Sequence, residues 1–184
     1  MLLVVGAVCL SWYALDRGRA ALYQFRLQTE LNEILEAGRV PAAPGRRTTA
    51  SAHRNAGLIG QLEIARLGLS AVVIEGDDRA SLQIAVGHLP GTPLPGENGN
   101  SAMAGHRDTF FHPLENVRLG DEIRVITPEA DYRYRVQSIL VVDPDDVWVL
   151  APTPRPSLTL VTCYPLTYIG SAPRRLVVRA DRLP

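Results

Sequence analysis

The sequence predicts a mainly β domain that follows a separate N-terminal region. From residue 58 onward, short apolar and β-branched runs recur, and residues in them alternate as in strands. Turn-forming residues separate the runs, and the chain holds 15 glycines and 14 prolines. The helical segments between the runs are short turns. About eight strands in this arrangement favour an antiparallel or mixed barrel or sandwich over a βαβ fold.

Length and charge limit the function classes. The 184 residues, at 20.1 kDa, fit one domain with a short appendage, and 46% hydrophobic residues suffice for a packed core. Basic and acidic residues balance at 19 each, so the formal net charge is +0. Phosphate binding needs a clustered excess of Lys and Arg, so no nucleic-acid partner is expected.

Residues 1–16 predict a transmembrane signal anchor. The stretch "MLLVVGAVCLSWYAL" is apolar and uncharged, and charges begin at Asp16. Trp12 and Tyr13 at its far end suit a membrane interface. Its length lies between a secretory core and a full span, so an anchor shortened at its start is one interpretation. A buried N-terminal helix is the alternative.

Residues 17–57 predict a juxtamembrane helix and a linker before a domain at 58–184. Apolar residues at 21–38 recur mostly at helical spacing, which indicates an amphipathic helix. Residues 39–57 mix Pro, Gly, Ala, Ser and Thr with basic residues and show no periodicity. A catalytic role is therefore not expected for His53.

The elements of the domain follow in order. Strands are expected in 58–76 (two, meeting at Gly68), 100–106, 121–128, 131–143, 157–163 and 174–183. Helical turns are expected in 79–89, 110–117 and 143–152, the last with acidic residues ahead of its apolar ones. Residues 88–106 contain a rigid, turn-rich loop that leads into a strand ending at His106.

Cys163 is the first candidate for chemistry. It follows the apolar run 157–162 and precedes Tyr164-Pro165, so its side chain is expected at the end of a strand. The other cysteine, Cys9, lies in the apolar N-terminal stretch, and a disulfide between them is not expected. A thiol in this position is either an inert packed residue or a nucleophile.

A thiol nucleophile needs a base and a donor for the oxyanion. His106 lies where a small-residue strand gives way to a polar turn, which is an accessible edge position. Arg174 and Arg175 begin the last strand, and either could favour a thiolate or hold a carbonyl oxygen. Because side chains alternate along a strand, only one of them can face the site. The alternative is a pair of solvated charges.

Three segments resemble the signature motifs of sortases, the membrane-anchored cysteine transpeptidases: "TLVTC" (159–163), "AGHRDTFF" (104–111) and "RRLVVRA" (174–180). The similarity extends from residue 58 to 183, and the "TCYP" and "GHRDTFF" forms are most like class D or class E. The resemblance implies a closed eight-stranded sortase-type β-barrel with short helical insertions, preceded by an N-terminal membrane-anchor helix.

The same resemblance implies the roles of the residues. Cys163 is expected to be the nucleophile that forms an acyl-thioester, and His106 the proton donor and acceptor. Arg175 is expected to stabilise the thiolate or the oxyanion, with Arg174 as the second choice. The implied substrate is a secreted protein with a C-terminal LPxTG-like signal, cleaved after Thr. The implied acceptor is an amine on a cell-wall precursor or a pilin lysine.

The resemblance also implies a single-pass protein of the cell membrane, bound to lipid by its anchor, with the catalytic domain on the extracytoplasmic side. No metal or other cofactor is expected, because the sequence has no HxxH or CxxC pairing and no phosphate-binding glycine loop. Two alternatives to a sortase are an L,D-transpeptidase and a non-catalytic barrel. An L,D-transpeptidase would carry a Ser-x-Gly-Cys segment, which this chain lacks. A non-catalytic, membrane-tethered barrel that binds a wall or surface partner would have Cys163 packed.

Overall fold

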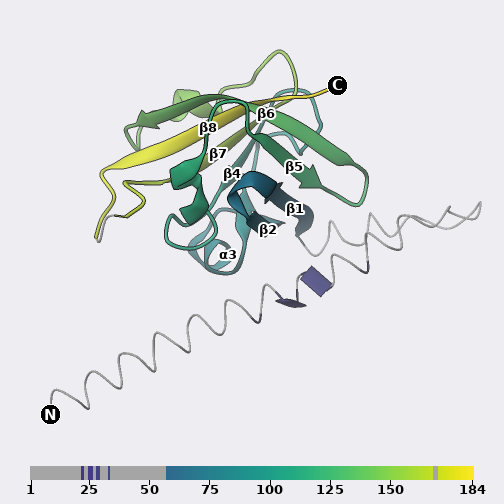
Figure 1. Ribbon diagram of the computed structural model, residues 1–184, viewed down its shortest axis with the longest axis horizontal. Coiled ribbons are helices and arrows are strands. Elements are labelled where there is room, and N and C mark those ends of the chain that lie inside the picture. Colours follow the sequence, from purple (N-terminus) through teal and green to yellow (C-terminus); the bar gives the residue numbers. More distant parts are fainter. Residues whose placement is uncertain (1–21, 23–24, 27, 30–32, 34–56, 168–169) are drawn as a thin grey trace, which may run out of the picture.

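The computed structural model describes residues 57–167 and 170–184, together with six helical residues near the N-terminus: Leu22, Phe25, Arg26, Gln28, Thr29 and Glu33 (Figure 1). The predicted anchor at 1–16 and the linker at 39–56 lie outside the described residues. Among the helices that are described, none has the length and apolar character that a membrane crossing needs.

The domain is a closed barrel of eight strands, which confirms the predicted mainly β architecture (Figure 1). The strands are β1 (Leu58–Ile64), β2 (Leu69–Glu75), β3 (Val86–His88), β4 (Asn100–Ala104), β5 (Glu122–Ile126), β6 (Asp131–Val142), β7 (Ser157–Tyr164) and β8 (Arg174–Arg182). Their order around the barrel is β1-β2-β3-β4-β7-β8-β6-β5, and β5 pairs with β1 to close it. The pairs β2–β3 and β4–β7 are parallel, and the others are antiparallel.

Short helices connect the strands: η1 (Ala65–Leu67), α3 (Arg79–Ile84), η2 (His112–Asn116) and η3 (Val147–Leu150). Helix α3 begins after Asp78, whose side chain accepts from the Ala80 and Ser81 amides. The acidic residues before η3 were expected to cap it, but no side chain does so.

The structure differs from the sequence prediction at β3 and at the end of β4. The sequence predicts a helical turn at residues 86–88, whereas they form β3 between β2 and β4. Three residues are too few to show a strand periodicity, so only their partners reveal the strand. The strand expected to run to His106 ends at Ala104, which leaves His106 in the following turn.

The interior of the barrel is filled by inward residues of all eight strands, with Phe111, Leu114 and Leu166 added from the connections. Tyr134 is among the largest fully buried side chains, and its hydroxyl accepts a hydrogen bond from the Gly96 amide at 2.8 Å. Burial raises the pKa of the Tyr134 phenol. A core packed in this way gives the strand ends a rigid frame.

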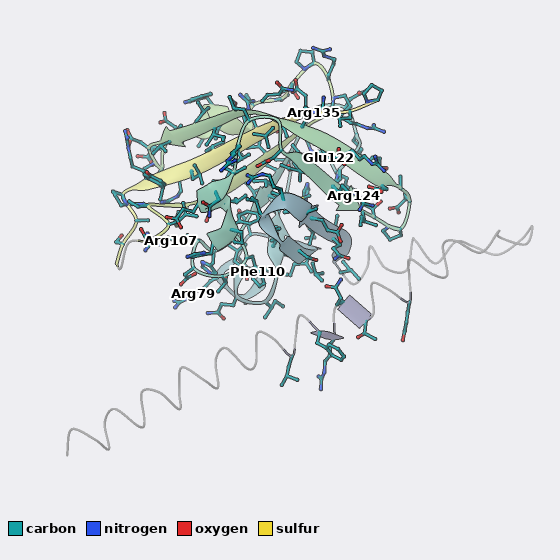
Figure 2. All side chains as sticks on the ribbon, viewed as in Figure 1. Arg79, Arg107, Phe110, Glu122, Arg124 and Arg135 are labelled. Carbon is teal, nitrogen blue, oxygen red and sulfur yellow. The ribbon has the colours of Figure 1, made fainter. Side chains whose placement is uncertain are left out.

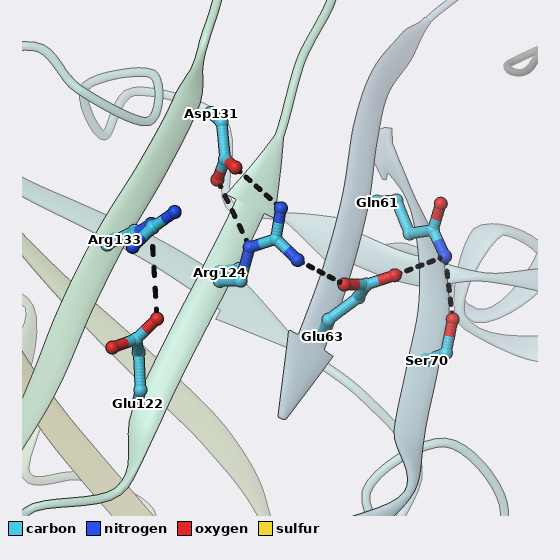
Figure 3. A network of polar contacts seen from close by, with 7 residues as sticks. All are labelled: Gln61, Glu63, Ser70, Glu122, Arg124, Asp131 and Arg133. Carbon is cyan, nitrogen blue, oxygen red and sulfur yellow. Dashed lines mark hydrogen bonds and ion pairs between the residues drawn. The ribbon is translucent and has the colours of Figure 1, made fainter. Parts of the chain in front are cut away.

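The seam where β5 closes on β1 carries a polar network on its outer face (Figure 3). Arg124 on β5 donates to Asp131 on β6 at 2.6 Å and to Glu63 on β1 at 3.3 Å. Gln61 extends the network from Glu63 to Ser70 on β2, with hydrogen bonds of 3.1 and 2.7 Å. Charged and polar side chains thus face water along this seam, opposite the apolar inner face.

The connection from β6 to β7 covers another part of the outer surface. Its η3 helix packs onto strands β6, β7 and β8 through an outer apolar cluster. The members of this cluster are Leu140, Val142, Val149, Leu150, Val161 and Val177. The cluster brings the β6–β7 connection next to the end of β7.

Candidate active site

The alternation of β7 decides where the thiol points. Leu158 and Leu160 are fully buried in the barrel interior, whereas Val161 belongs to the outer apolar cluster. Cys163 lies two residues beyond Val161 and therefore shares its outward face. The thiol is free and half-buried, one residue before the end of the strand. It is therefore presented on the outer surface of the barrel, beside an apolar floor.

Arg175 lies directly opposite Cys163 in the β7–β8 ladder. Paired residues of an antiparallel ladder point to the same face, so the guanidinium and the thiol share the outer face. Arg174 pairs with Tyr164 instead, which turns it to the other face. Its guanidinium is half exposed and forms an ion pair with Asp143 at 3.2 Å.

The Arg175 guanidinium is held by carbonyls of its own neighbourhood. Its Nη1 donates to the Arg174 carbonyl at 3.0 Å and to the Ala172 carbonyl at 3.4 Å. No carboxylate in the described part of the chain lies within ion-pair distance of Arg175, in contrast to Arg174. The positive charge of Arg175 is therefore not neutralised there, which suits it to an anion that forms nearby.

His106 reaches the same edge from β4, the other neighbour of β7. The parallel ladder pairs Ala104 with Val161, and the Gly105 amide extends it by donating to the Val161 carbonyl at 3.3 Å. Both chains run two residues beyond this pair, to His106 and to Cys163. His106, in the turn that follows β4, and Cys163, on β7, therefore lie at the same end of two adjacent parallel strands, and His106 is half-buried.

Two local features hold this end of β4 in place. The Thr162 hydroxyl, which is buried, donates to the Gly105 carbonyl at 2.7 Å. The His106 carbonyl accepts from the Phe111 amide at 3.0 Å, which closes the following turn. A Cβ at Gly105 would lie 2.9 Å from the Phe111 ring, so glycine lets the buried ring pack against the turn. The position of His106 is therefore determined by the backbone on both sides.

The other predicted or possible groups do not join this edge. His88 is 2% exposed, and its ring nitrogens contact Glu75 at 2.7 Å and the Pro93 carbonyl at 3.0 Å. His112 is exposed on η2, and His53 lies outside the described residues. Within the described ranges, no group of three or more His, Cys, Asp or Glu side chains could hold a metal ion.

A pocket of about 360 Å³ lies at the opposite end of the barrel, between the start of β1 and the β5–β6 turn. Its lining residues include Gly57, Leu94, Pro128 and Tyr132 but none of the predicted site residues. The ladder of β6 and β8 pairs Tyr134 with Arg182 near this end and Val142 with Arg175 at the other. The candidate active site is therefore the exposed edge at Cys163, not this pocket.

Two residues that sequence reasoning missed hold the surroundings of the site. Asn100 is 1% exposed, and its amide donates to the Val149 and Ala151 carbonyls of the β6–β7 connection at 3.1 and 3.3 Å. Its oxygen accepts from the Thr159 hydroxyl on β7 at 2.6 Å. Arg107 contacts the connection after Cys163. The only sequence signal was that Arg107 follows His106 directly; Asn100 had none.

A free thiol, an imidazole and a guanidinium at three neighbouring strand ends of a closed barrel define a class of cysteine-site barrel proteins. Comparison with known proteins gives the family. The family model of the sortase domain matches residues 62–183. The chain belongs to the sortase family.

Individual relatives agree with this assignment. "Sortase D" of Bacillus subtilis (strain 168) is 33% identical over 125 residues, which cover 67% of this chain and 63% of the relative. The structure of a Clostridium perfringens Sortase D5 transpeptidase has a TM-score of 0.73 at 24% identity and covers 88% of this chain and 99% of that one, which shows the fold.

A Clostridium perfringens sortase C, solved with the C-terminal cell wall sorting motif, has a TM-score of 0.63 at 30% identity and covers 69% and 71% of the two chains. The two class D matches are consistent with the resemblance to class D or E. The chain spans less than two thirds of the length of the curated Sortase D.

Proposed function

We propose that this protein is a cysteine transpeptidase that cleaves an LPxTG-like sorting signal after its Thr and transfers the new carboxyl end to an amine. The observation that carries the proposal is the pairing of Cys163 with Arg175 on one face, with His106 two residues beyond the end of the adjacent parallel strand. This arrangement supplies the three groups that acyl transfer through a thioester needs.

In the first half-reaction the Cys163 thiol transfers its proton to His106, and the thiolate sulfur attacks the Thr carbonyl carbon. A C–S bond forms and the carbonyl π pair moves to oxygen, where Arg175 is placed to donate hydrogen bonds to the oxyanion. When the oxyanion collapses, the C–N bond breaks and His106 donates a proton to the leaving amine. The products are a thioacyl-enzyme and the C-terminal peptide.

In the second half-reaction an incoming amine attacks the thioester carbon. His106 accepts the proton of the amine, the new C–N bond forms, and the C–S bond breaks to return the thiolate. Water can replace the amine and gives hydrolysis at a lower rate. The acceptor class is a primary amine, on a cell-wall precursor or on a pilin lysine.

Two observations support a peptide substrate of this kind. The sortase C structure with a C-terminal cell wall sorting motif belongs to a relative of the same fold. The outer apolar cluster includes Val161, two residues before Cys163, and η3, which packs on this cluster, exposes Val147 and Trp148. These residues offer a surface for apolar residues that precede the scissile bond.

We propose further that the N-terminal residues 1–16 anchor the chain in the cell membrane and that the barrel acts on the extracytoplasmic side. The support is the uncharged, apolar sequence with a Trp-Tyr pair at its end. Secreted proteins with a sorting signal and surface amines would both be present in that compartment.

The decisive experiment uses the full chain in mild detergent with a panel of fluorogenic LPxTG-type peptides. Turnover by the wild type, a thioacyl adduct on Cys163 in intact-protein mass spectra, and loss of both in Cys163→Ala are expected. Added amine should shift the product from acid to amide. Turnover retained in Cys163→Ala would exclude the proposed nucleophile.

The non-catalytic alternative predicts an inert thiol. A methanethiosulfonate reagent should label Cys163 of the folded protein within minutes if the thiol is presented at the edge. Labelling only after denaturation would favour the alternative, in which Cys163 is a packing residue.

A further inference from the structure

Arg107, the residue after His106, holds the connection between β7 and β8. Its Nη1 donates to the Pro165 carbonyl at 3.0 Å, and its Nη2 donates to the Gly170 carbonyl at 2.5 Å. Figure 2 labels Arg107 beside this connection, and its side chain is half-buried. One guanidinium thus contacts the chain two residues after the thiol and again near the start of β8.

This connection leads from the nucleophile strand to the arginine strand. Leu166, next to Pro165, is 6% exposed and packs in the barrel interior. At the other end, the Ala172 carbonyl accepts from Nη1 of Arg175. Only Ser171 separates Gly170, whose carbonyl Arg107 contacts, from Ala172, whose carbonyl contacts Arg175. A short path of contacts therefore runs from Arg107 to the guanidinium of Arg175.

We propose that Arg107 is a positioning residue for acyl transfer, which fixes Arg175 beside the Cys163 thiol by holding the β7–β8 connection at Pro165 and Gly170. The inference rests on the proposed function of the site. Arg107 does not contact the reacting atoms in this scheme. Arg107 directly follows His106 in the chain. These two adjacent residues therefore supply the proton carrier, His106, and the contact that holds the β7–β8 connection, on which the position of Arg175 depends.

The chemistry of arginine fits this role better than that of lysine. A guanidinium is planar and presents several N–H groups in a fixed fork, so it can reach two separate carbonyls at once. A lysine ammonium is a point donor on a flexible stem and can maintain only part of this arrangement. The arginine-to-lysine change is therefore informative at this position.

The test measures kcat and KM of the full chain with the sorting-signal peptide for Arg107→Met and Arg107→Lys. Arg107→Met should lower kcat about 10- to 100-fold, since a small displacement of a catalytic group has effects of this size, while KM changes less than about threefold. Arg107→Lys should recover part of the loss. In an Arg175→Met background, adding Arg107→Met should cost less than about twofold, because the group it positions is gone.

Arg135→Met is the matched control. Arg135 is exposed on β6 opposite Asp181, six residues along β8 from Arg175, and its substitution should leave kcat unchanged. Equal losses for Arg107→Met with and without Arg175 would overturn the positioning role, as would a kcat within twofold of the wild type. The folded fraction of Arg107→Met is measured by circular dichroism at the assay temperature. If the loss of kcat equals the loss of folded protein, Arg107 has only a structural role, and the positioning role is excluded. The wild type and Cys163→Ala report separately on the proposed function, because they test turnover without any change at Arg107.

Discussion

Cys163 and Arg175 are direct partners in the antiparallel ladder of β7 and β8, while Arg174 pairs with Tyr164 and bonds Asp143 on the other face. Because the pleat alternates, a change of one residue in register would exchange the two arginines. Arg175 therefore shares a face with the thiol, whereas the adjacent Arg174 does not. Substituting each arginine in turn should have very different effects on activity.

Arg175→Met should lower kcat about 100- to 1000-fold, the effect expected when an oxyanion donor is removed. Arg174→Met should change kcat less than about threefold, because it removes only an exposed ion pair, and such pairs contribute about 0 to 1 kcal/mol. Both variants are measured with the same fluorogenic peptide. The opposite ranking would show that Arg174 faces the reacting carbonyl.

His106→Gln should lower kcat about 100- to 10,000-fold, the range that general acid–base catalysis supplies. The reason is that no other histidine among the described residues lies at the edge of Cys163. His112→Gln is the control, since His112 is exposed on η2. If the two variants had similar rates, His106 would not be the proton carrier.

Asn100→Asp should destabilise the fold by about 1 to 3 kcal/mol, because the carboxyl group loses the amide donors to the buried Val149 carbonyl and to the Ala151 carbonyl. The measurement is the urea midpoint, followed by tryptophan fluorescence. Asn98→Asp, at an exposed turn position, should change stability by less than about 0.5 kcal/mol. An unchanged midpoint for Asn100→Asp would mean that the β6–β7 connection does not depend on this contact.

Asp121→Asn should destabilise the protein at neutral pH and have a vanishing effect in acid. Asp121 accepts hydrogen bonds from Arg66 Nε and Nη2 and from the Arg118 amide. The Arg66 side chain is the main cause of the lowered pKa of this carboxyl group, and burial opposes the shift.

A lowered folded pKa means that the stabilisation is complete above the unfolded pKa of about 3.9 and is lost as the pH falls through the folded pKa. The difference in free energy of unfolding between the wild type and Asp121→Asn should therefore be constant near pH 7 and shrink below about pH 4. Denaturation curves at several pH values measure it. A difference that does not change with pH would show that the Asp121 charge is not the source of the stabilisation.

Much of the barrel could be predicted from local patterns. The strands at 131–142 and 157–164 carry enough alternation or apolar length to be found without partners. β3 could not be found, because its three residues become a strand only by pairing with β2 and β4. The same pairing buries His88 at the end of β3, where the fold surrounds it with Glu75, Thr92 and Pro93.

The sequence by itself determined the mainly β class, the position of Cys163 at the end of an apolar run, and the sortase motifs around Cys163 and His106. These are local properties, written in the order and spacing of side chains. Only the tertiary structure decided that β4 and β7 are parallel neighbours, that Arg175 faces the thiol, and that Arg107 reaches Pro165 and Gly170. Those relationships join residues 57 or more positions apart or depend on register, and no local pattern encodes them.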